Sequence, residues 1–185
     1  YTLSLHDALP ISFLTGCGNS KATNSGENKG KKLSYEDIKV GFLYVGPVGD
    51  GGWTYSHDQG RKYLEKELGI KPSIIQESVK EDDAEVQNTV ESMIDQGCNV
   101  IIGTSFGFLN GMLKSAKDHP EVKFMHCSGN KVADNLSNYF GRIYEARYLS
   151  GIVAGMKTKS NVIGYVAAHE MPEVVRGIKD RKSVV

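Results

Sequence analysis

Short apolar segments alternate with longer amphipathic segments along most of the chain. The apolar segments are rich in Val, Ile and Phe, which is typical of buried strands. The amphipathic segments repeat apolar residues at helical spacing, as Val86, Val90 and Ile94 do, and end at glycines such as Gly97. The pattern predicts strands over 38–45, 72–78, 99–105, 121–127 and 161–167, an edge strand near the NYFG segment, and helices over 54–69, 82–97, 108–118 and about 142–158.

This alternation predicts an α/β fold, in which helices cover both faces of a parallel sheet through right-handed crossovers. Ligands of such sheets bind outside the carboxyl ends of the strands. The stretches that follow predicted strands are GPVGDGGWTY, GTSFGF, CSGN and AHEMPE. We therefore expect these stretches to meet at one edge of the sheet and to form a binding site there.

Trp53, the single tryptophan, stands at the exit of the glycine-rich loop 46–52. Glycines let a backbone approach a ligand closely, and an indole offers a flat face on which a base stacks with about 1–3 kcal/mol. Asp50 can accept hydrogen bonds from ribose hydroxyls or ring N–H groups. Two simpler interpretations stay open, Trp53 as a core residue and Asp50 as a turn or N-cap residue. We expect His57 and Asp58 to lie on a solvated helix face.

The charges balance, with 22 Lys and Arg residues against 22 Asp and Glu residues, so no basic field indicates a nucleic-acid partner. The cysteines are Cys17, Cys98 and Cys127. Their odd number and the lack of C-x-x-C spacing argue against a disulfide framework and a structural zinc site. We expect Cys98 and Cys127 to be small core residues, and His126 to be an interior histidine of its strand.

The segment FLTGC, residues 13–17, resembles the lipobox of bacterial lipoproteins, in which the cysteine is diacylated and becomes the mature N-terminus. Residues 18–37 are polar and rich in Gly, Asn, Ser and Lys, so they contain too little apolar surface to order themselves. Two acyl chains hold a protein on a membrane without spanning it. The sequence thus predicts a lipid anchor on Cys17, followed by a flexible tether.

Three segments carry a family resemblance: KVGFLYVGPVGDGGWTYSHDQGRKYLEKELG, IIGTSFGFLNGMLKSAKDHPEVKFMHCSGN and IGYVAAHEMPEVVRGI. Together, over about residues 38–179, they resemble the basic membrane protein family, also called PnrA-like, of substrate-binding lipoproteins of ABC importers. The family motif of an Asp followed three residues later by an aromatic aligns with Asp50 and Trp53. Asn110 stands where the family often has an Asp, which changes the chemistry at that position.

The resemblance implies a type I periplasmic-binding-protein fold, with two α/β lobes that close over a purine nucleoside or nucleobase. It implies a lipid-anchored protein on the extracytoplasmic face of the cell membrane, which passes its ligand to ABC permease and ATPase subunits. Neither catalysis nor a cofactor, metal or nucleic acid is expected. With the strand ends, the resemblance predicts ten ligand-binding residues: Asp50, Trp53, Thr54, Tyr55, Ser105, Phe106, Asn110, Gly129, Asn130 and His169.

The predicted organisation has a ligand-binding lobe at its centre. Its parts are residues 1–11 and 180–185 of non-native, adapter-derived character, 12–17 as the end of a signal peptide, 18–37 as the tether, 38–158 as the N-terminal lobe, and 159–179 as the start of a truncated second lobe.

Three other functions stay open. A Rossmann-type enzyme would need G-x-G-x-x-G in register or a P-loop Lys-Ser/Thr, and loop 46–52 has neither. The ligand-sensing half of a transcription repressor would need a helix-turn-helix in front, which residues 18–37 do not supply. Another planar solute, such as a flavin, would also stack on Trp53.

Overall fold

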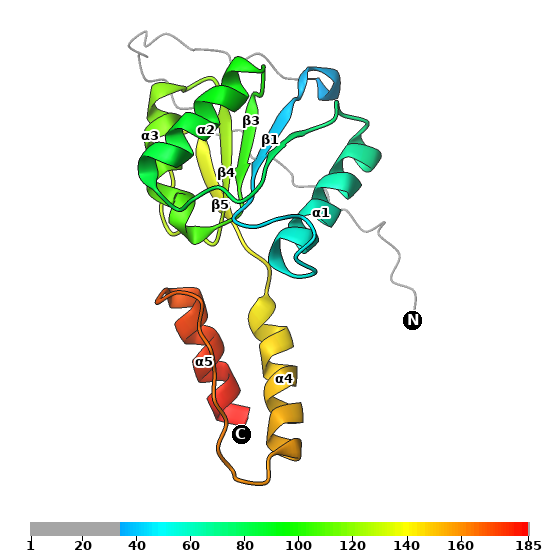
Figure 1. Ribbon diagram of the computed structural model, residues 1–185, viewed down its shortest axis with the longest axis vertical. Coiled ribbons are helices and arrows are strands. Elements are labelled where there is room, and N and C mark those ends of the chain that lie inside the picture. The colour runs from blue at the N-terminus through cyan, green and yellow to red at the C-terminus, as the bar shows by residue number, and fades with distance from the viewer. Residues whose placement is uncertain (1–33, 185) are drawn as a thin grey trace, which may run out of the picture. The chain divides into compact units, whose positions relative to one another are not determined.

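The computed structural model describes residues 34–184 (Figure 1). The predicted lipobox, with Cys17, and most of the predicted tether lie outside the described residues. The strands are β1 Val40–Leu43, β2 Ile74–Gln76, β3 Val100–Gly103, β4 Lys123–Cys127 and β5 Leu136–Tyr139. The helices are η1 Tyr35–Asp37, α1 Trp53–Leu68, α2 Asp83–Asp95, η2 Phe106–Phe108, α3 Leu109–Asp118, α4 Ile143–Lys157 and α5 Pro172–Val184.

All the strands belong to one parallel sheet in the order β2-β1-β3-β4-β5, which confirms the predicted α/β fold. In the register, Gly41 lies beside Ile101, and Gly103 lies beside His126. β5 is the edge strand predicted near NYFG. Because the strands are parallel, the carboxyl ends of β1, β3, β4 and β5 lie at the same edge of the sheet.

The core has one part on each face of the sheet. Successive side chains of a strand point to opposite faces, so Phe42 and Tyr44 belong to the cluster beside α1, while Leu43 packs toward α2 and α3. Figure 1 shows α2 and α3 on one side of the sheet and α1 on the other. Cys98 and Cys127 are buried, as predicted.

The predicted strand over residues 161–167 is wrong. These residues link α4 to α5 without strand conformation, and Val162 and Val166 are 77% and 99% exposed. A strand is stable only when its backbone pairs within a sheet, and the sheet of the described residues ends at β2 and β5. The sequence pattern also missed α5, which begins at Pro172 and continues through residues 180–184. The non-native origin of these last residues stays a prediction.

α4 packs against α5 and leaves another part of its surface uncovered. The apolar side chains there repeat at helical spacing: Leu149 is 62% exposed, Ile152 36%, Val153 59% and Met156 80%. We call these four residues the α4 stripe. Within residues 34–184, no helix is long and apolar enough to cross a bilayer.

α2 and α3 approach each other closely at Gly111. A Cβ atom added there would lie 2.7 Å from the Cβ of Val86 and 3.0 Å from the carbonyl oxygen of Asp83. The absent side chain therefore allows the two helices to pack directly over the sheet. Gly60, on α1, has open space where its Cβ would stand.

We expect Gly111→Ala to lower the free energy of unfolding by about 1–3 kcal/mol, because the added methyl group overpacks the α2–α3 contact. Gly60→Ala is the matched control and is expected to raise it by about 0.5–1 kcal/mol, because alanine has the higher helix propensity. Urea denaturation followed by circular dichroism measures both changes. Equal stabilisation by the two substitutions would show that the close approach at Gly111 is not a packing constraint.

Candidate functional site

Trp53 is the first residue of α1 and lies at the edge of the sheet where the strands end. Its indole N–H donates a 2.8 Å hydrogen bond to the carbonyl oxygen of Thr104, the first residue after β3. The ring centroid lies 4.7 Å from that of His57 and 6.3 Å from that of Phe140, and the residue is 38% exposed. Trp53 is therefore not a core residue, because its ring is held in place while part of it faces solvent.

Asp50 caps the first turn of α1. Its Oδ1 accepts hydrogen bonds from the backbone N–H groups of Gly52 (2.8 Å) and Tyr55 (2.9 Å), and its Oδ2 accepts one from Thr54 (2.9 Å). These bonds, from Gly52, Tyr55 and Thr54, lower the pKa of the Asp50 carboxyl group. The structure thus supports the interpretation of Asp50 as a turn residue, which caps the helix start from two residues before the N-cap position of Gly52, while a ligand contact of Asp50 stays a prediction.

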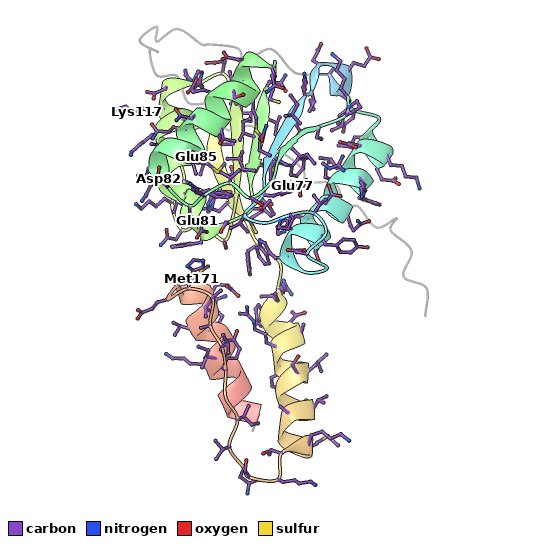
Figure 2. All side chains as sticks on the ribbon, in the orientation of Figure 1. Glu77, Glu81, Asp82, Glu85, Lys117 and Met171 are labelled. Carbon is purple, nitrogen blue, oxygen red and sulfur yellow. The ribbon has the colours of Figure 1, made fainter. Side chains whose placement is uncertain are left out.

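A cavity of about 300 Å³ lies beside Trp53, where the strand ends meet the start of α4 and the segment that leads into α5. Figure 2 labels Met171, one of its lining residues. The lining residues are Val45, Trp53, Ser105, Phe106, Ser128, Phe140, Ile143, Arg147, Ala168, His169, Met171, Glu173 and Val174.

Four of the ten predicted ligand-binding residues line this cavity: Trp53, Ser105, Phe106 and His169. The other six lie outside its lining, and a role in binding stays a prediction for all ten. Asp50, Tyr55, Asn110 and Asn130 are exposed, Thr54 is buried, and Gly129 packs against His126 and Asn138. Residues of the same loop do not all line the cavity, because successive side chains point in different directions.

Sequence reasoning missed several residues of the cavity. Ser128 directly follows β4 and Phe140 directly follows β5, so the rule that ligands bind at strand ends would have found both. Arg147 and Glu173 form a 2.5 Å ion pair between α4 and α5. No local motif marked that pair, because it depends on how the two helices pack.

Glu81, on the loop before α2, is a further residue that the sequence did not single out (Figure 2). Its Oε1 accepts hydrogen bonds from the hydroxyl of Ser105 and from the backbone N–H of Gly107 (3.3 Å). Its Oε2 lies 3.7 Å from Nε2 of His169. Glu81 thus contacts two residues that line the cavity, Ser105 and His169.

His126 is fully buried, as predicted for an interior histidine. A carbonyl oxygen only accepts, so the 2.8 Å contact between Nε2 of His126 and the backbone oxygen of Ser105 places a proton on Nε2. Burial lowers the pKa of His126 to about 4. The imidazole is therefore neutral at neutral pH, and its hydrogen bond to Ser105 stabilises the loop that follows β3.

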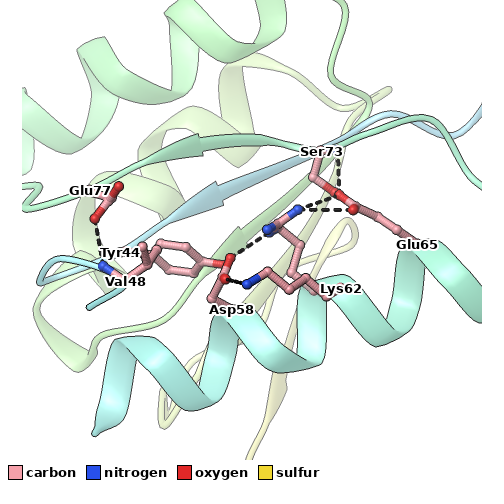
Figure 3. Close-up of polar contacts among 8 residues, drawn as sticks. Tyr44, Val48, Asp58, Lys62, Glu65, Ser73 and Glu77 are labelled. Atoms are coloured by element: carbon pink, nitrogen blue, oxygen red, sulfur yellow. Dashed lines mark hydrogen bonds and ion pairs between the residues drawn. The ribbon is translucent and has the colours of Figure 1, made fainter. Parts of the chain in front are cut away.

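The expectation of a solvated face is wrong for Asp58, which is only 2% exposed (Figure 3). Its carboxylate contacts Arg61 at 2.7 Å and Lys62 at 2.9 Å, and the hydroxyl of Tyr44 lies 3.5 Å away. Burial alone would raise the pKa of Asp58, but the hydrogen bonds and charges of Arg61 and Lys62 lower it overall. Arg61 also pairs with Glu65, which accepts a 2.7 Å hydrogen bond from the backbone N–H of Ser73. The network therefore connects α1 to Tyr44, directly after β1, and to the segment before β2.

A larger groove of about 500 Å³ lies along α1 on the face of the sheet, lined mainly by apolar side chains such as Ile102 and Met125. It covers the face of the sheet, whereas ligands of parallel sheets bind at the edge where the strands end. Among the described residues, no group of three or more His, Cys, Asp or Glu side chains is arranged to hold a metal ion. The cavity beside Trp53 is therefore the candidate ligand site.

Residues 37–180 match the family described as "ABC transporter substrate-binding protein PnrA-like". The chain belongs to this family. The match contains both the sheet and the cavity beside Trp53. Members of the PnrA-like family are the substrate-binding components of transporters, as the sequence resemblance implied.

Two curated relatives of this PnrA-like chain carry different ligand names. A purine-binding protein of Brucella abortus is 44% identical over 144 residues, which are 77% of this chain and 41% of the relative. A Haloferax volcanii protein, whose name provisionally gives glucose as its ligand in an ABC transporter, is 36% identical over 165 residues, 87% of this chain and 42% of the relative. The chain thus spans less than half the length of both relatives.

A solved ABC transporter solute-binding protein of Aeropyrum pernix has the same fold. It superposes with a TM-score of 0.65 at 23% identity, over 80% of this chain and 42% of that chain. The parallel sheet described above therefore shares its fold with part of that structure.

His126 makes the stability of the protein depend on pH. Between pH 6.5 and about 4 the unfolded chain binds a proton at this position that the folded chain does not, so the free energy of unfolding falls as the pH is lowered. The full loss is about 3 kcal/mol. His126→Gln retains an N–H donor for Ser105 without titrating, so its stability is expected to change less over this range. Parallel denaturation curves at pH 7 and pH 4 test this.

Proposed function

We propose that the full-length protein captures a purine nucleoside or nucleobase outside the cytoplasm and delivers it, unaltered, to an ABC permease. The observation that carries this proposal is the placement of Trp53. Its partly exposed indole is fixed by the hydrogen bond to Thr104 and forms one wall of a cavity at the strand ends. Phe106 and Phe140 add aromatic surface to the same cavity.

The composition of the cavity favours a flat heterocycle over a sugar. Aromatic rings provide sequence-tolerant stacking surfaces of about 1–3 kcal/mol per base. A few polar groups of the lining, including Ser105, Ser128 and His169, suit the polar edge of such a ring. The purine-binding name of the Brucella relative agrees with this assignment.

Binding without chemistry also fits the polar contacts of the cavity. A serine nucleophile is activated when it donates its proton to a histidine or another base that an acid orients. Here the hydroxyl of Ser105 donates to the carboxylate of Glu81, and His169 contacts the second oxygen of that carboxylate. The carboxylate of Glu81 thus lies between Ser105 and His169. These contacts stabilise the lining of the site, and they do not pass a proton from Ser105 to an imidazole.

The remaining parts of the proposal concern the whole polypeptide. A diacylated Cys17 would hold the protein on the extracytoplasmic face of the membrane, and residues 18–37 would give it reach. Residues 159–179 would begin a second lobe, and closure of that lobe would complete the cavity and expel water from it. The partners would be permease and ATPase subunits.

Mass spectrometry of the membrane fraction should find a diacyl modification on Cys17, and an unmodified protein would rule out the anchor.

A thermal-shift assay on the full-length polypeptide that carries this sequence tests the ligand class. A purine nucleoside at 100 times its Kd should stabilise the protein by about 2.7 kcal/mol. We expect Trp53→Ala to abolish this shift, because the stacking surface is lost, while the melting temperature without ligand changes by only a few degrees.

Tyr63→Ala is the matched control, since Tyr63 is an aromatic residue of the same helix that is 67% exposed and does not line the cavity. This variant should keep the full ligand-induced shift. A Trp53→Ala protein that still responds to nucleosides would contradict the proposed site, and a panel without any stabilising purine would contradict the proposed ligand class.

A further inference from the structure

We propose that the cavity selects planar ligands whose edge carries hydrogen-bond donors, such as amino or ring N–H groups, and that Glu81 is the positioning residue that sets this preference. The inference rests on the proposed function, because it describes how the same site would choose among bases. It follows from the direction in which the hydroxyl and N–H groups at the ends of β3 and β4 donate their protons.

The hydroxyl of Ser105 has only one proton, and its partner determines where that proton points. A carboxylate only accepts hydrogen bonds, so the contact with Oε1 of Glu81 commits the proton of Ser105 to Glu81. Ser105 is 8% exposed and lines the cavity. Only the oxygen lone pairs of Ser105 therefore remain available to a ligand, and they can only accept.

Ser128, directly after the neighbouring strand β4, also has its hydroxyl proton committed to another group of the protein. Its hydroxyl donates a 2.6 Å hydrogen bond to the carbonyl oxygen of Cys127, so it too offers only lone pairs to the cavity. Ser105 follows the end of β3 and Ser128 follows the end of β4, and both residues line the same cavity. One heterocycle in that cavity would therefore meet both acceptors.

Two N–H donors beside the exits of β3 and β4 are used within the protein. The indole N–H of Trp53 donates to the carbonyl oxygen of Thr104, and the Nε2–H of His126 donates to the carbonyl oxygen of Ser105. Arg147, which lines the cavity from α4, donates through Nη1 to Glu173. A guanidinium has five N–H groups, so this contact does not exhaust its donors, and the donor-edge preference concerns the part of the lining at the ends of β3 and β4. The wall formed by the ends of β3 and β4 thus presents acceptors, and a ligand edge that also carries only acceptors would leave them unpaired.

Glu81 controls this polarity although it does not line the cavity itself. Its Oε1 also accepts from the backbone N–H of Gly107, which fixes the carboxylate against the β3 exit loop. Its Oε2 faces Nε2 of His169 at 3.7 Å. Without the carboxylate, the hydroxyl of Ser105 could rotate and donate into the cavity, so a ligand acceptor would be tolerated as well as a donor.

The test uses two pairs of nucleosides with the full-length polypeptide. Adenosine and 6-methylpurine riboside differ by an amino group against a methyl group of similar size, and guanosine and inosine differ by an amino group against hydrogen. Calorimetric titration measures the ratio of affinities within each pair. We expect the amino member of at least one pair to bind about 10- to 100-fold more tightly, because its partner leaves a buried acceptor unpaired.

Glu81→Ala is expected to reduce that ratio at least fivefold without weakening the partner that lacks the amino group. Ser105→Ala removes the acceptor itself and should reduce the ratio in the same way, so it tests the inference even if Glu81→Ala fails to fold. Glu85→Ala, on the exposed first turn of α2, is the matched control and should leave the ratio unchanged.

The outcomes separate the two levels of the proposal. Equal binding within both pairs, or an unchanged ratio in Glu81→Ala and Ser105→Ala proteins that fold, would overturn the donor-edge inference and leave purine binding intact. Failure of all four nucleosides and of their free bases to bind would overturn the proposed function, and the inference with it. A loss of affinity that is equal for both members of a pair would assign Glu81 a structural role only.

Discussion

Parallel pairing of β1, β3 and β4 is the constraint from which the candidate site follows. The pairing brings the ends of these strands to one edge, so residues far apart in the sequence, such as Trp53, Ser105 and Ser128, line one cavity. Both faces of such a sheet are needed for packing, and the edge remains the place where polar groups can gather. Each exit loop then supports the next: His126 on β4 donates to the carbonyl oxygen of Ser105, and Trp53 donates to that of Thr104.

The start of α1 shows how one short segment serves both stability and recognition. Asp50 uses its carboxylate to accept the backbone N–H groups that a helix start leaves without partners. The loop before it is attached to the end of β2, because the backbone N–H of Val48 donates a 2.6 Å hydrogen bond to Glu77 (Figure 3). With the helix start fixed in this way, the hydrogen bond from the indole N–H to the carbonyl oxygen of Thr104 sets the orientation of the Trp53 ring.

The sequence predicted the sheet and its helices well where local patterns carry the information. Alternating apolar segments and glycine stops identified β1 to β5 and α1 to α4 within a few residues. The pattern failed over 161–167, where an apolar run reads as a strand although its pairing partners would have to come from another sheet. Asp58 was misjudged for a similar reason, because its burial depends on Arg61, Lys62 and Tyr44 together.

The candidate site was predictable only in part. Rules about strand ends identified Trp53, Ser105 and Phe106, and the same rules cover Ser128 and Phe140. His169 lines the cavity although the strand predicted in front of it does not form. No rule about single residues points to Glu81, since its role arises from a side chain that crosses from the β2 exit to the β3 exit. Directional hydrogen bonding is thus the part of the site that needs coordinates, because a hydroxyl that accepts and a hydroxyl that donates look alike in a sequence.

The α4 stripe has a practical consequence for biochemistry on this region. Leu149, Val153 and Met156 present an apolar surface to water, and exposed apolar patches of this kind drive proteins to associate. Residues 34–184 prepared by themselves should therefore self-associate as their concentration rises. Light scattering across a dilution series would reveal this behaviour, and Met156→Lys would supply the charge needed to keep the preparation dispersed.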